Sequence, residues 1–200
     1  MFDNVTKSIR VLSAGSVEKA NSGHPGMPLG MADVGTVLYK NFLKVTNNCP
    51  DWINRDRFVL SAGHGSALLY SLLHFNGFDI SIDDMKNFRQ LNSKTPGHPE
   101  LDTKLGIDIT TGPLGQGFAT GVGLALAESY LSNTFGDKII NHFTYGIVSD
   151  GDLMEGLSQE AAELAALWGL GKLIYIFDDN NISIDGSVDK VSVTNQKTKF

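Results

Sequence analysis

The sequence is poor in cysteine, in basic residues and in long apolar runs. Cys49 is the only cysteine among 200 residues, so no disulfide can form within the chain, and we expect a reducing, cytoplasmic setting. Sixteen Lys and Arg stand against 22 Asp and Glu, and the formal charge of −6 argues against bulk-charge binding of nucleic acid. The most apolar stretch, residues 68–75, is far shorter than the ~20 residues that cross a bilayer. We therefore predict no nucleic-acid partner and no membrane partner.

Glycine, in contrast, is abundant, with 22 of the 200 residues against an average of about 7%. It gathers in a few loops, and the apolar spacing between these loops predicts regular elements. Helices are expected near residues 5–18, 31–38, 66–75 and 153–168, with another that opens in the run 110–117 and ends near 131. Strands are expected at 57–61, 143–149 and 173–177, whereas 76–109 is expected to be mixed and loop-rich.

The order of these elements indicates an α/β fold. A strand, a helix and a strand follow one another over residues 143–177, a βαβ unit whose two strands should be parallel. We predict a parallel sheet with helices on both faces. Residues 198–200 show neither a helix stop nor the composition of a tail, so we expect the fold to be incomplete.

Polar residues follow two of the predicted strands, at the edge where parallel α/β sheets bind ligands. Asp150 follows one strand, and Asn180 lies 30 residues later, after the next. Their oxygens, with a main-chain carbonyl near Ile182, suit a small divalent ion such as Mg²⁺. On spacing alone, an equally good interpretation is that Asp150 caps a helix and that residues 178–181 form a solvated turn. The metal interpretation predicts that the Asp150 and Asn180 oxygens face one point.

A glycine-rich run, residues 112–117, precedes a predicted helix. The glycines at 115, 117 and 121 are one residue off the dinucleotide-binding fingerprint, and no predicted strand leads into them. Free N–H groups at the helix N-terminus would suit a phosphate, and the alternative is a helix cap in close packing. A metal that bridges a diphosphate to Asp150 would connect this loop with the strand ends.

Three of the five histidines, His24, His64 and His98, each follow a glycine in a segment rich in helix breakers. An imidazole in a rigid loop can donate to phosphate or sugar oxygens and can move protons near neutral pH. A zinc site is the competing interpretation, but the sequence has neither HExxH nor CxxC. We expect the three histidines to converge on one cleft.

Several runs together resemble the leading part of a transketolase, within its thiamine-diphosphate-binding domain. The matching runs, in order, are 22–26 (SGHPG), 63–70, 95–100 (TPGHPE), 111–117 (TGPLGQG) and 150–181, the last being the thiamine-diphosphate signature. Ser149 departs from the general signature, which has a glycine there. A deoxyxylulose-phosphate synthase shares the metal motif but is not expected to carry both SGHPG and TPGHPE.

The resemblance implies a thiamine diphosphate cofactor and a divalent metal, Mg²⁺ or else Ca²⁺ or Mn²⁺. The implied cofactor contacts are His64, Gly112, Pro113, Leu114, Gly151 and Asn180, and the implied metal ligands are Asp150, Asn180 and the Ile182 carbonyl. The catalytic and substrate-binding positions are His24 and His98, which match histidines that hold sugar hydroxyls and assist proton transfer. Glu155 matches an acidic residue of the interface that couples paired active sites.

The resemblance also implies that half an active site is present. Residues 1–200 correspond to the N-terminal part of a diphosphate-binding domain, and the pyrimidine-binding and C-terminal domains have no counterpart. The cofactor-activating glutamate of the family lies in that second domain, on a homodimer partner chain, or here on a separate C-terminal subunit. The implied reaction is transfer of a two-carbon ketol unit between sugar phosphates, with this chain inactive alone. The alternative is a truncated, non-catalytic remnant that at most binds cofactor or a partner chain.

Overall fold

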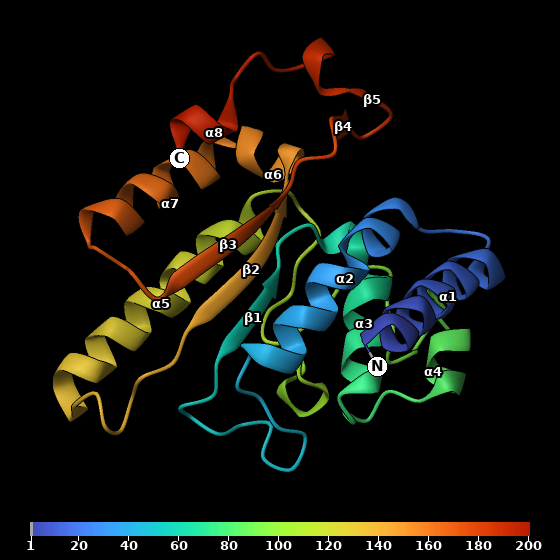
Figure 1. The fold of residues 1–200 in the computed structure, drawn as a ribbon, viewed down its shortest axis with the longest axis horizontal. Helices are drawn as coiled ribbons and strands as arrows, with labels where there is room; N and C mark the ends of the chain where they lie inside the picture. The colour runs from blue at the N-terminus through green and yellow to red at the C-terminus, as the bar shows by residue number, and fades with distance from the viewer. Residues whose placement is uncertain (1) are drawn as a thin grey trace.

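The computed structural model describes residues 2–200, and its centre is a three-stranded parallel sheet (Figure 1). The strands lie in the order β1 (Arg57–Leu60), β2 (Thr144–Ser149) and β3 (Leu173–Asp178). Leu60 pairs with Ile147, and Ser149 pairs with Asp178. Because all three strands run the same way, their carboxyl ends meet at one edge of the sheet.

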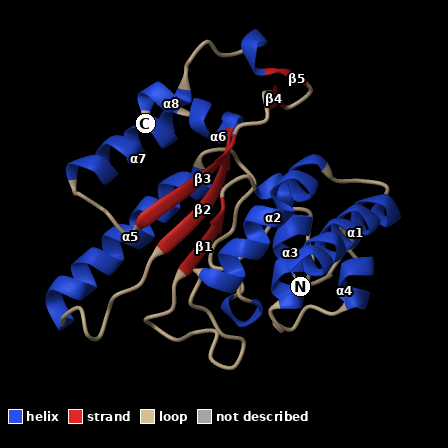
Figure 2. Cartoon of the chain, viewed as in Figure 1, coloured by secondary structure: helices blue, strands red, loops and turns tan. Residues whose placement is uncertain are grey.

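Helices cover both faces of this sheet (Figure 2). On one face lie α5 (Gln116–Phe135) and α7 (Gly156–Leu167), and on the other lie α2 (Gly26–Asn41) and α3 (Ser66–Phe75), with α1 (Phe2–Ala20) packed on these two. Side chains alternate along β2, so that Ile147 enters the core with α1 to α3 and Val148 enters the core with α5 and α7. The predicted α/β class is confirmed. None of the described helices is both long and apolar enough to cross a membrane.

The predicted helix over 153–168 is wrong in one respect, because the structure divides it. α6 (Asp150–Met154) ends at Glu155, whose φ of −70° and ψ of 136° are extended, and α7 begins at Gly156. The glycine-rich loop crosses at this break, since a Cβ on Gly115 would lie 2.9 Å from the Glu155 Cβ. Apolar spacing continues across the break, so the sequence pattern does not reveal it.

Short elements fill the rest of the chain. α4 (Ile82–Lys86) lies in the segment expected to be loop-rich, and the Ser81 Oγ accepts from the Asp84 nitrogen while the Asp84 carboxylate accepts from the Ser81 nitrogen. This capping box explains why so short a helix forms. The remaining elements are β4 (Ile182–Ser183), β5 (Gly186–Ser187), α8 (Gln196–Lys199) and the 3-10 turns Gly63–Gly65, Thr103–Leu105 and Val188–Lys190.

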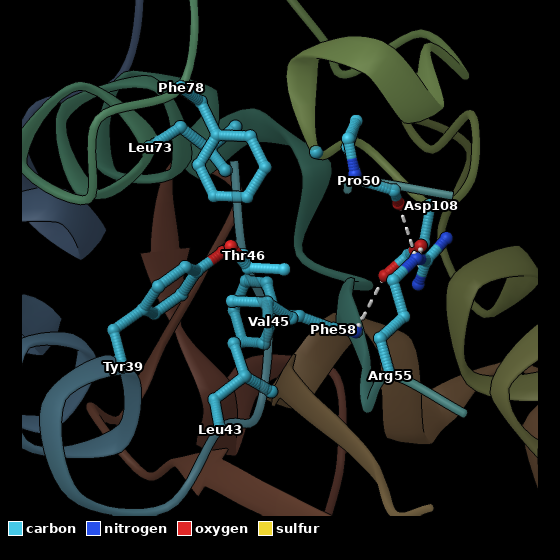
Figure 3. A pocket seen from close by; sticks show the side chains of 11 residues that line it. Tyr39, Leu43, Val45, Thr46, Pro50, Arg55, Phe58, Leu73, Phe78 and Asp108 are labelled. Carbon is cyan, nitrogen blue, oxygen red and sulfur yellow. Dashed lines mark hydrogen bonds and ion pairs between the residues drawn. The ribbon is translucent and has the colours of Figure 1, made fainter. Parts of the chain in front are cut away.

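The amino end of the sheet buries an ion pair (Figure 3). Arg55 Nη1 lies 2.6 Å from Asp108 Oδ1, with the two side chains 9% and 6% exposed. Asp108 Oδ2 accepts from the Phe58 nitrogen at 2.8 Å, and Arg55 Nε donates to the Pro50 carbonyl at 2.6 Å. The cavity beside this pair is about 10 Å³, no larger than one water. The pair therefore joins residues 50–58 to Asp108 with little free space beside it.

Candidate active site

Asp150 lies at the carboxyl end of β2, as the first residue of α6. It is 5% exposed, and its Oδ2 has no hydrogen-bond partner. Burial, and then the charges of Asp179 and Asp178, raise the pKa of Asp150. Ser149 occupies the N-cap position, so the interpretation of Asp150 as a helix cap is not supported. A buried carboxylate oxygen without a donor, such as this Oδ2, costs free energy that a bound cation would offset.

An open cleft of about 380 Å³ lies next to Asp150. Phe177, Asp179 and Asn181 line one part of it, and residues between 187 and 197 line another. This volume is within the range of small-molecule sites. There is therefore room for a ligand beside Asp150, whereas the cavity beside Asp108 has none.

Asn180 follows β3 by two residues, and the Ser149–Asp178 pairing brings it to the strand end beside that of Asp150. Its Nδ2 donates to Asp178 Oδ2 at 3.0 Å, and its Oδ1 accepts from the Ile182 nitrogen at 2.9 Å. These two bonds fix the direction of the amide, and Oδ1 keeps a second lone pair for another partner.

The structure does not bring the whole predicted metal set together in the cleft. Asp150 lines it, whereas Asn180 and Ile182 are exposed and are not among its lining residues. Within residues 2–200 there is no cluster of three or more His, Cys, Asp or Glu side chains able to hold a metal. The predicted set has one carboxylate, one amide and one carbonyl, and the shared point between them stays a prediction.

The glycine-rich loop packs directly on both neighbouring loops. A Cβ on Gly63 would lie 2.8 Å from the Gly112 nitrogen, and a Cβ on Gly151 would lie 3.0 Å from Leu114 Cδ1. Gly112 itself has a φ of +152°, which L side chains rarely adopt. The predicted cofactor contacts Gly112, Leu114 and Gly151 therefore share one surface next to the His64 turn, and Pro113 is exposed on the same loop.

The N–H groups at the start of α5 are largely occupied. The Gly115 nitrogen donates to Asp152 Oδ1 at 2.9 Å, and the Phe118 nitrogen donates to Ser61 Oγ at 2.9 Å. A phosphate at this helix N-terminus is therefore not supported, and the alternative of a cap in close packing describes the loop.

Asp152, which the sequence analysis did not single out, connects the loops of the site. It is fully buried, and its Oδ1 accepts from Ser61 Oγ at 2.8 Å and from the Gly115 nitrogen at 2.9 Å. Its Oδ2 accepts from the Ser149 nitrogen at 3.0 Å and from Ser149 Oγ at 3.1 Å. One carboxylate thus holds the ends of β1 and β2 and the glycine-rich loop together. The Ser-x-x-Asp spacing of residues 149–152 is the signal that could have identified it.

Two of the three histidines are in contact, and His98 is near enough to influence them, while their convergence on one cleft stays a prediction. The rings of His24 and His64 are 5.3 Å apart, edge to face. Burial first, then His24 and, more weakly, His98 lower the pKa of the half-buried His64, and Asp152 opposes them. Burial, then Arg89 and His24, lower the pKa of His98. Both imidazoles are therefore favoured in the neutral form, which can accept a proton.

Each of these histidines follows a glycine because the chain passes tightly over a neighbour there. A Cβ on Gly23 would lie 3.1 Å from Phe88 Cε1, and a Cβ on Gly97 would lie 3.1 Å from Arg89 Nε. The corresponding contact of Gly63 is with Thr111 and Gly112, as described above. The glycines thus let each histidine loop pack closely on its neighbour.

Comparison with known proteins decides the family. The family model described as "Transketolase, thiamine diphosphate binding domain" matches residues 2–200. The chain belongs to the transketolase family. A transketolase of Bacillus subtilis (strain 168) is 56% identical over 196 residues, which cover 96% of this chain and 29% of that protein.

Solved transketolases have the same fold. The Campylobacter jejuni transketolase is 52% identical with a TM-score of 0.96, over all of this chain and 31% of that one. A Pichia stipitis transketolase in complex with sedoheptulose 7-phosphate is 46% identical with a TM-score of 0.94, over 99% of this chain and 30% of that one. This transketolase-family chain therefore spans about 30% of the relatives that it matches.

Proposed function

We propose that this chain supplies the diphosphate and metal side of a transketolase active site. The complete site would transfer a two-carbon ketol unit from a ketose phosphate to an aldose phosphate. One observation carries the proposal: the unpartnered, buried Asp150 carboxylate lies at the sheet edge where the histidine loops and the glycine-rich loop also gather. The Pichia stipitis relative bound to sedoheptulose 7-phosphate supports sugar phosphates as the substrate class.

In this proposal Asp150, the Asn180 amide oxygen and the Ile182 carbonyl hold a divalent cation, Mg²⁺ or else Ca²⁺ or Mn²⁺. The donor set fits, because all three atoms are hard oxygens and Asp150 Oδ2 has no competing donor. Waters and diphosphate oxygens complete the shell of such an ion. The negative charges of Asp178 and Asp179, which raise the pKa of Asp150, also favour a cation there.

Thiamine diphosphate, when bound, supplies an electron sink for breaking and forming a carbon–carbon bond next to a carbonyl. The residues proposed to contact it are His64, Gly112, Pro113, Leu114, Gly151 and Asn180. The close loop packing at Gly63 and Gly151 would let main-chain atoms approach the ligand. Asp152 would keep that surface in place by its four hydrogen bonds.

His24 and His98 are the proposed catalytic and substrate-binding residues. Both are exposed, and both come from loops that end beside His64. A neutral imidazole can accept a proton from a sugar hydroxyl and return it, which typically contributes ~10²–10⁴ in rate. The lowered pKa of His98 favours that neutral form at physiological pH.

The proposal requires a second, pyrimidine-binding domain, which would supply the carboxylate that activates the cofactor. That domain would come from a homodimer partner or from a separate subunit. A chimera tests this directly: this chain replaces the matching 196 residues of the Bacillus subtilis transketolase. Ketol transfer from xylulose 5-phosphate to ribose 5-phosphate is then measured for the chimera and for residues 1–200 alone, each with thiamine diphosphate and Mg²⁺.

We expect the chimera to be active and residues 1–200 alone to be inactive. Turnover by the 200 residues alone would contradict the half-site proposal. A folded, dimeric chimera without activity would favour the non-catalytic remnant. A separately produced C-terminal part of the Bacillus subtilis enzyme is also added to residues 1–200. Activity restored by this addition would indicate that the two parts can function as separate subunits.

A further inference from the structure

Arg89 lies in an uncommon backbone conformation between the loops of two site histidines. Its φ is +61°, a left-handed value that favours glycine. The Arg89 nitrogen donates to the Thr95 carbonyl at 2.9 Å, which closes the turn just before the His98 loop. A non-glycine residue keeps such a conformation only where surrounding contacts determine it, and these positions concentrate at functional sites.

The Arg89 side chain spans the gap between the two loops. Its Nη1 donates to Ser22 Oγ at 2.7 Å, two residues before His24. Its Nε lies 3.1 Å, and its Cζ 3.4 Å, from the point where a Gly97 Cβ would lie, one residue before His98. The guanidinium therefore lies against residues one or two positions before each of the two histidines.

Phe88 holds the guanidinium in this place. Its ring lies 5.6 Å from the Arg89 Cζ, within the range of a cation–π contact. The same ring also lies against Gly23, with Cε1 3.1 Å from the position of a Cβ there. Phe88 and Arg89 thus form one brace, since each contacts the His24 loop and Arg89 continues to the His98 loop.

We propose that Arg89 is a positioning residue that ties the His24 loop to the His98 loop, so that both imidazoles face the same substrate. The proposal rests on the roles proposed above for these two histidines. Arg89 is not proposed to touch the substrate, because its observed contacts are with Ser22, Gly97 and Phe88.

Electrostatics supports the same inference. After burial, Arg89 is the largest cause that lowers the pKa of His98, followed by His24. A cation behind His98 disfavours protonation and leaves the imidazole able to accept a proton. A lysine could replace this charge, but its ammonium could not both donate to Ser22 and fill the space that the planar guanidinium occupies beside Gly97.

The first test is a histidine titration followed by NMR on the isotopically labelled 200-residue chain, without cofactor or substrate. The variants are Arg89→Gln, Arg89→Lys and Ser22→Ala. Lys86→Gln is the matched control, since it removes a cation of the same segment whose ion pair is with the exposed Asp83. The His74 resonance, whose ring contacts the Ile80 carbonyl at 2.7 Å, reports an intact fold.

We expect Arg89→Gln to raise the pKa of His98 and to shift the amide signals of residues 22–24 and 97–98. Arg89→Lys should keep the pKa of His98 low but should shift those amides, and Ser22→Ala should shift residues 22–24. If Arg89→Gln changes the His98 titration no more than Lys86→Gln does, the inference is overturned. If Arg89→Gln does not fold, Arg89→Lys and Ser22→Ala test the same inference. Unchanged amide signals of residues 22–24 and 97–98 in both variants would show that Arg89 does not link the two loops.

The second test measures kcat/KM for variants of the chimera. Misplacement by about 1 Å can cost ~10²-fold in rate, so Arg89→Gln should lower kcat/KM by about a hundredfold, with Lys86→Gln unchanged. An unchanged kcat/KM in Arg89→Gln, with His24→Ala and His98→Ala impaired, would overturn the role of Arg89 and leave the proposed function standing. If the two histidine variants keep full activity, the proposed function fails, and the titration alone then decides whether Arg89 ties the loops.

Discussion

Both ends of the sheet contain buried carboxylates, but the hydrogen bonding of these carboxylates differs between the two ends. At the amino end, both oxygens of Asp108 have donors, and so do both oxygens of Asp56, from the Phe143 and Lys44 nitrogens at 2.7 Å each. At the carboxyl end, Asp150 Oδ2 has none. A carboxylate with all its donors holds segments together, whereas one without a donor is available for a ligand.

The carboxyl end also contains a carboxylate whose hydrogen bonds hold the neighbouring loops in place. Asp152, two residues after Asp150, has all of its four hydrogen bonds within the protein. The cavities agree with this division, because about 10 Å³ lies beside Asp108 and about 380 Å³ beside Asp150. The candidate site thus combines an open region beside Asp150 with a neighbouring carboxylate, Asp152, whose hydrogen bonds are all made within the protein. Substitutions at the two positions should therefore differ in their effects on ligand binding and on stability.

Asp108→Asn should have the largest effect on stability. It leaves the Arg55 guanidinium buried at 9% exposure without its ion partner, and removing one member of a buried pair typically costs ~3–5 kcal/mol. Urea unfolding of the 200-residue chain measures this, with the exposed Asp137→Asn as the control. A loss below about 1 kcal/mol would mean that the pair contributes little and that the comparison between the ends is wrong.

Asp150→Asn should have the opposite profile. It removes a buried charge that has no donor on Oδ2, so the free energy of unfolding of the ligand-free chain should stay the same or rise. Affinity of the chimera for thiamine diphosphate with Mg²⁺ should fall by more than the ~10–100-fold that is typical of residues behind a metal ligand. Calorimetric titration measures it. Asp179→Asn, in the same cleft and with the same loss of charge, should weaken binding much less.

Asp152→Asn should affect both properties by a smaller amount. The amide presents an NH₂ group where the carboxylate accepted hydrogen bonds, and hydrogen bonds to a charged group are worth ~1.5–3 kcal/mol. We expect a loss of that size in urea unfolding, together with weaker cofactor binding in the chimera as the glycine-rich loop loosens. Unchanged amide signals at Ser61 and Gly115 would show that the carboxylate does not hold these loops.

The sequence predicts the open parts of the site better than their support. Asp150 follows a recognisable strand and His98 lies in a distinctive glycine-proline run, so local patterns identify both. Asp152 contacts Ser61 across 91 positions and Arg89 contacts Ser22 across 67, and no local pattern encodes such partners. The break at Glu155 was missed for the same reason, because it depends on a distant loop that crosses there.

The smallest expected effect is a pH dependence at the amino end, where the His142 ring is buried with one nitrogen unpartnered. It is 4% exposed, its Nδ1 has no partner, and burial followed by the Arg57 charge lowers its pKa to about 4. The ordinary value is about 6.5, so the unfolded chain takes up a proton first as the pH falls. This contribution to stability is therefore complete above pH ~6.5, falls between ~6.5 and ~4, and levels off once the folded protein is protonated too.

His142→Phe should remove this contribution, because a phenyl ring fills the same buried place without a proton to bind. Urea unfolding at several pH values between 4.5 and 7.5 should show a slope shallower by up to about one proton than that of the unsubstituted chain. Ile139→Gln, an exposed change nearby that does not titrate, should keep the original slope. If His142→Phe keeps it as well, the acid sensitivity of the fold lies in its carboxylates. Asp150 would not be among them, because burial raises its pKa, so the folded chain binds that proton first and gains stability as the pH falls.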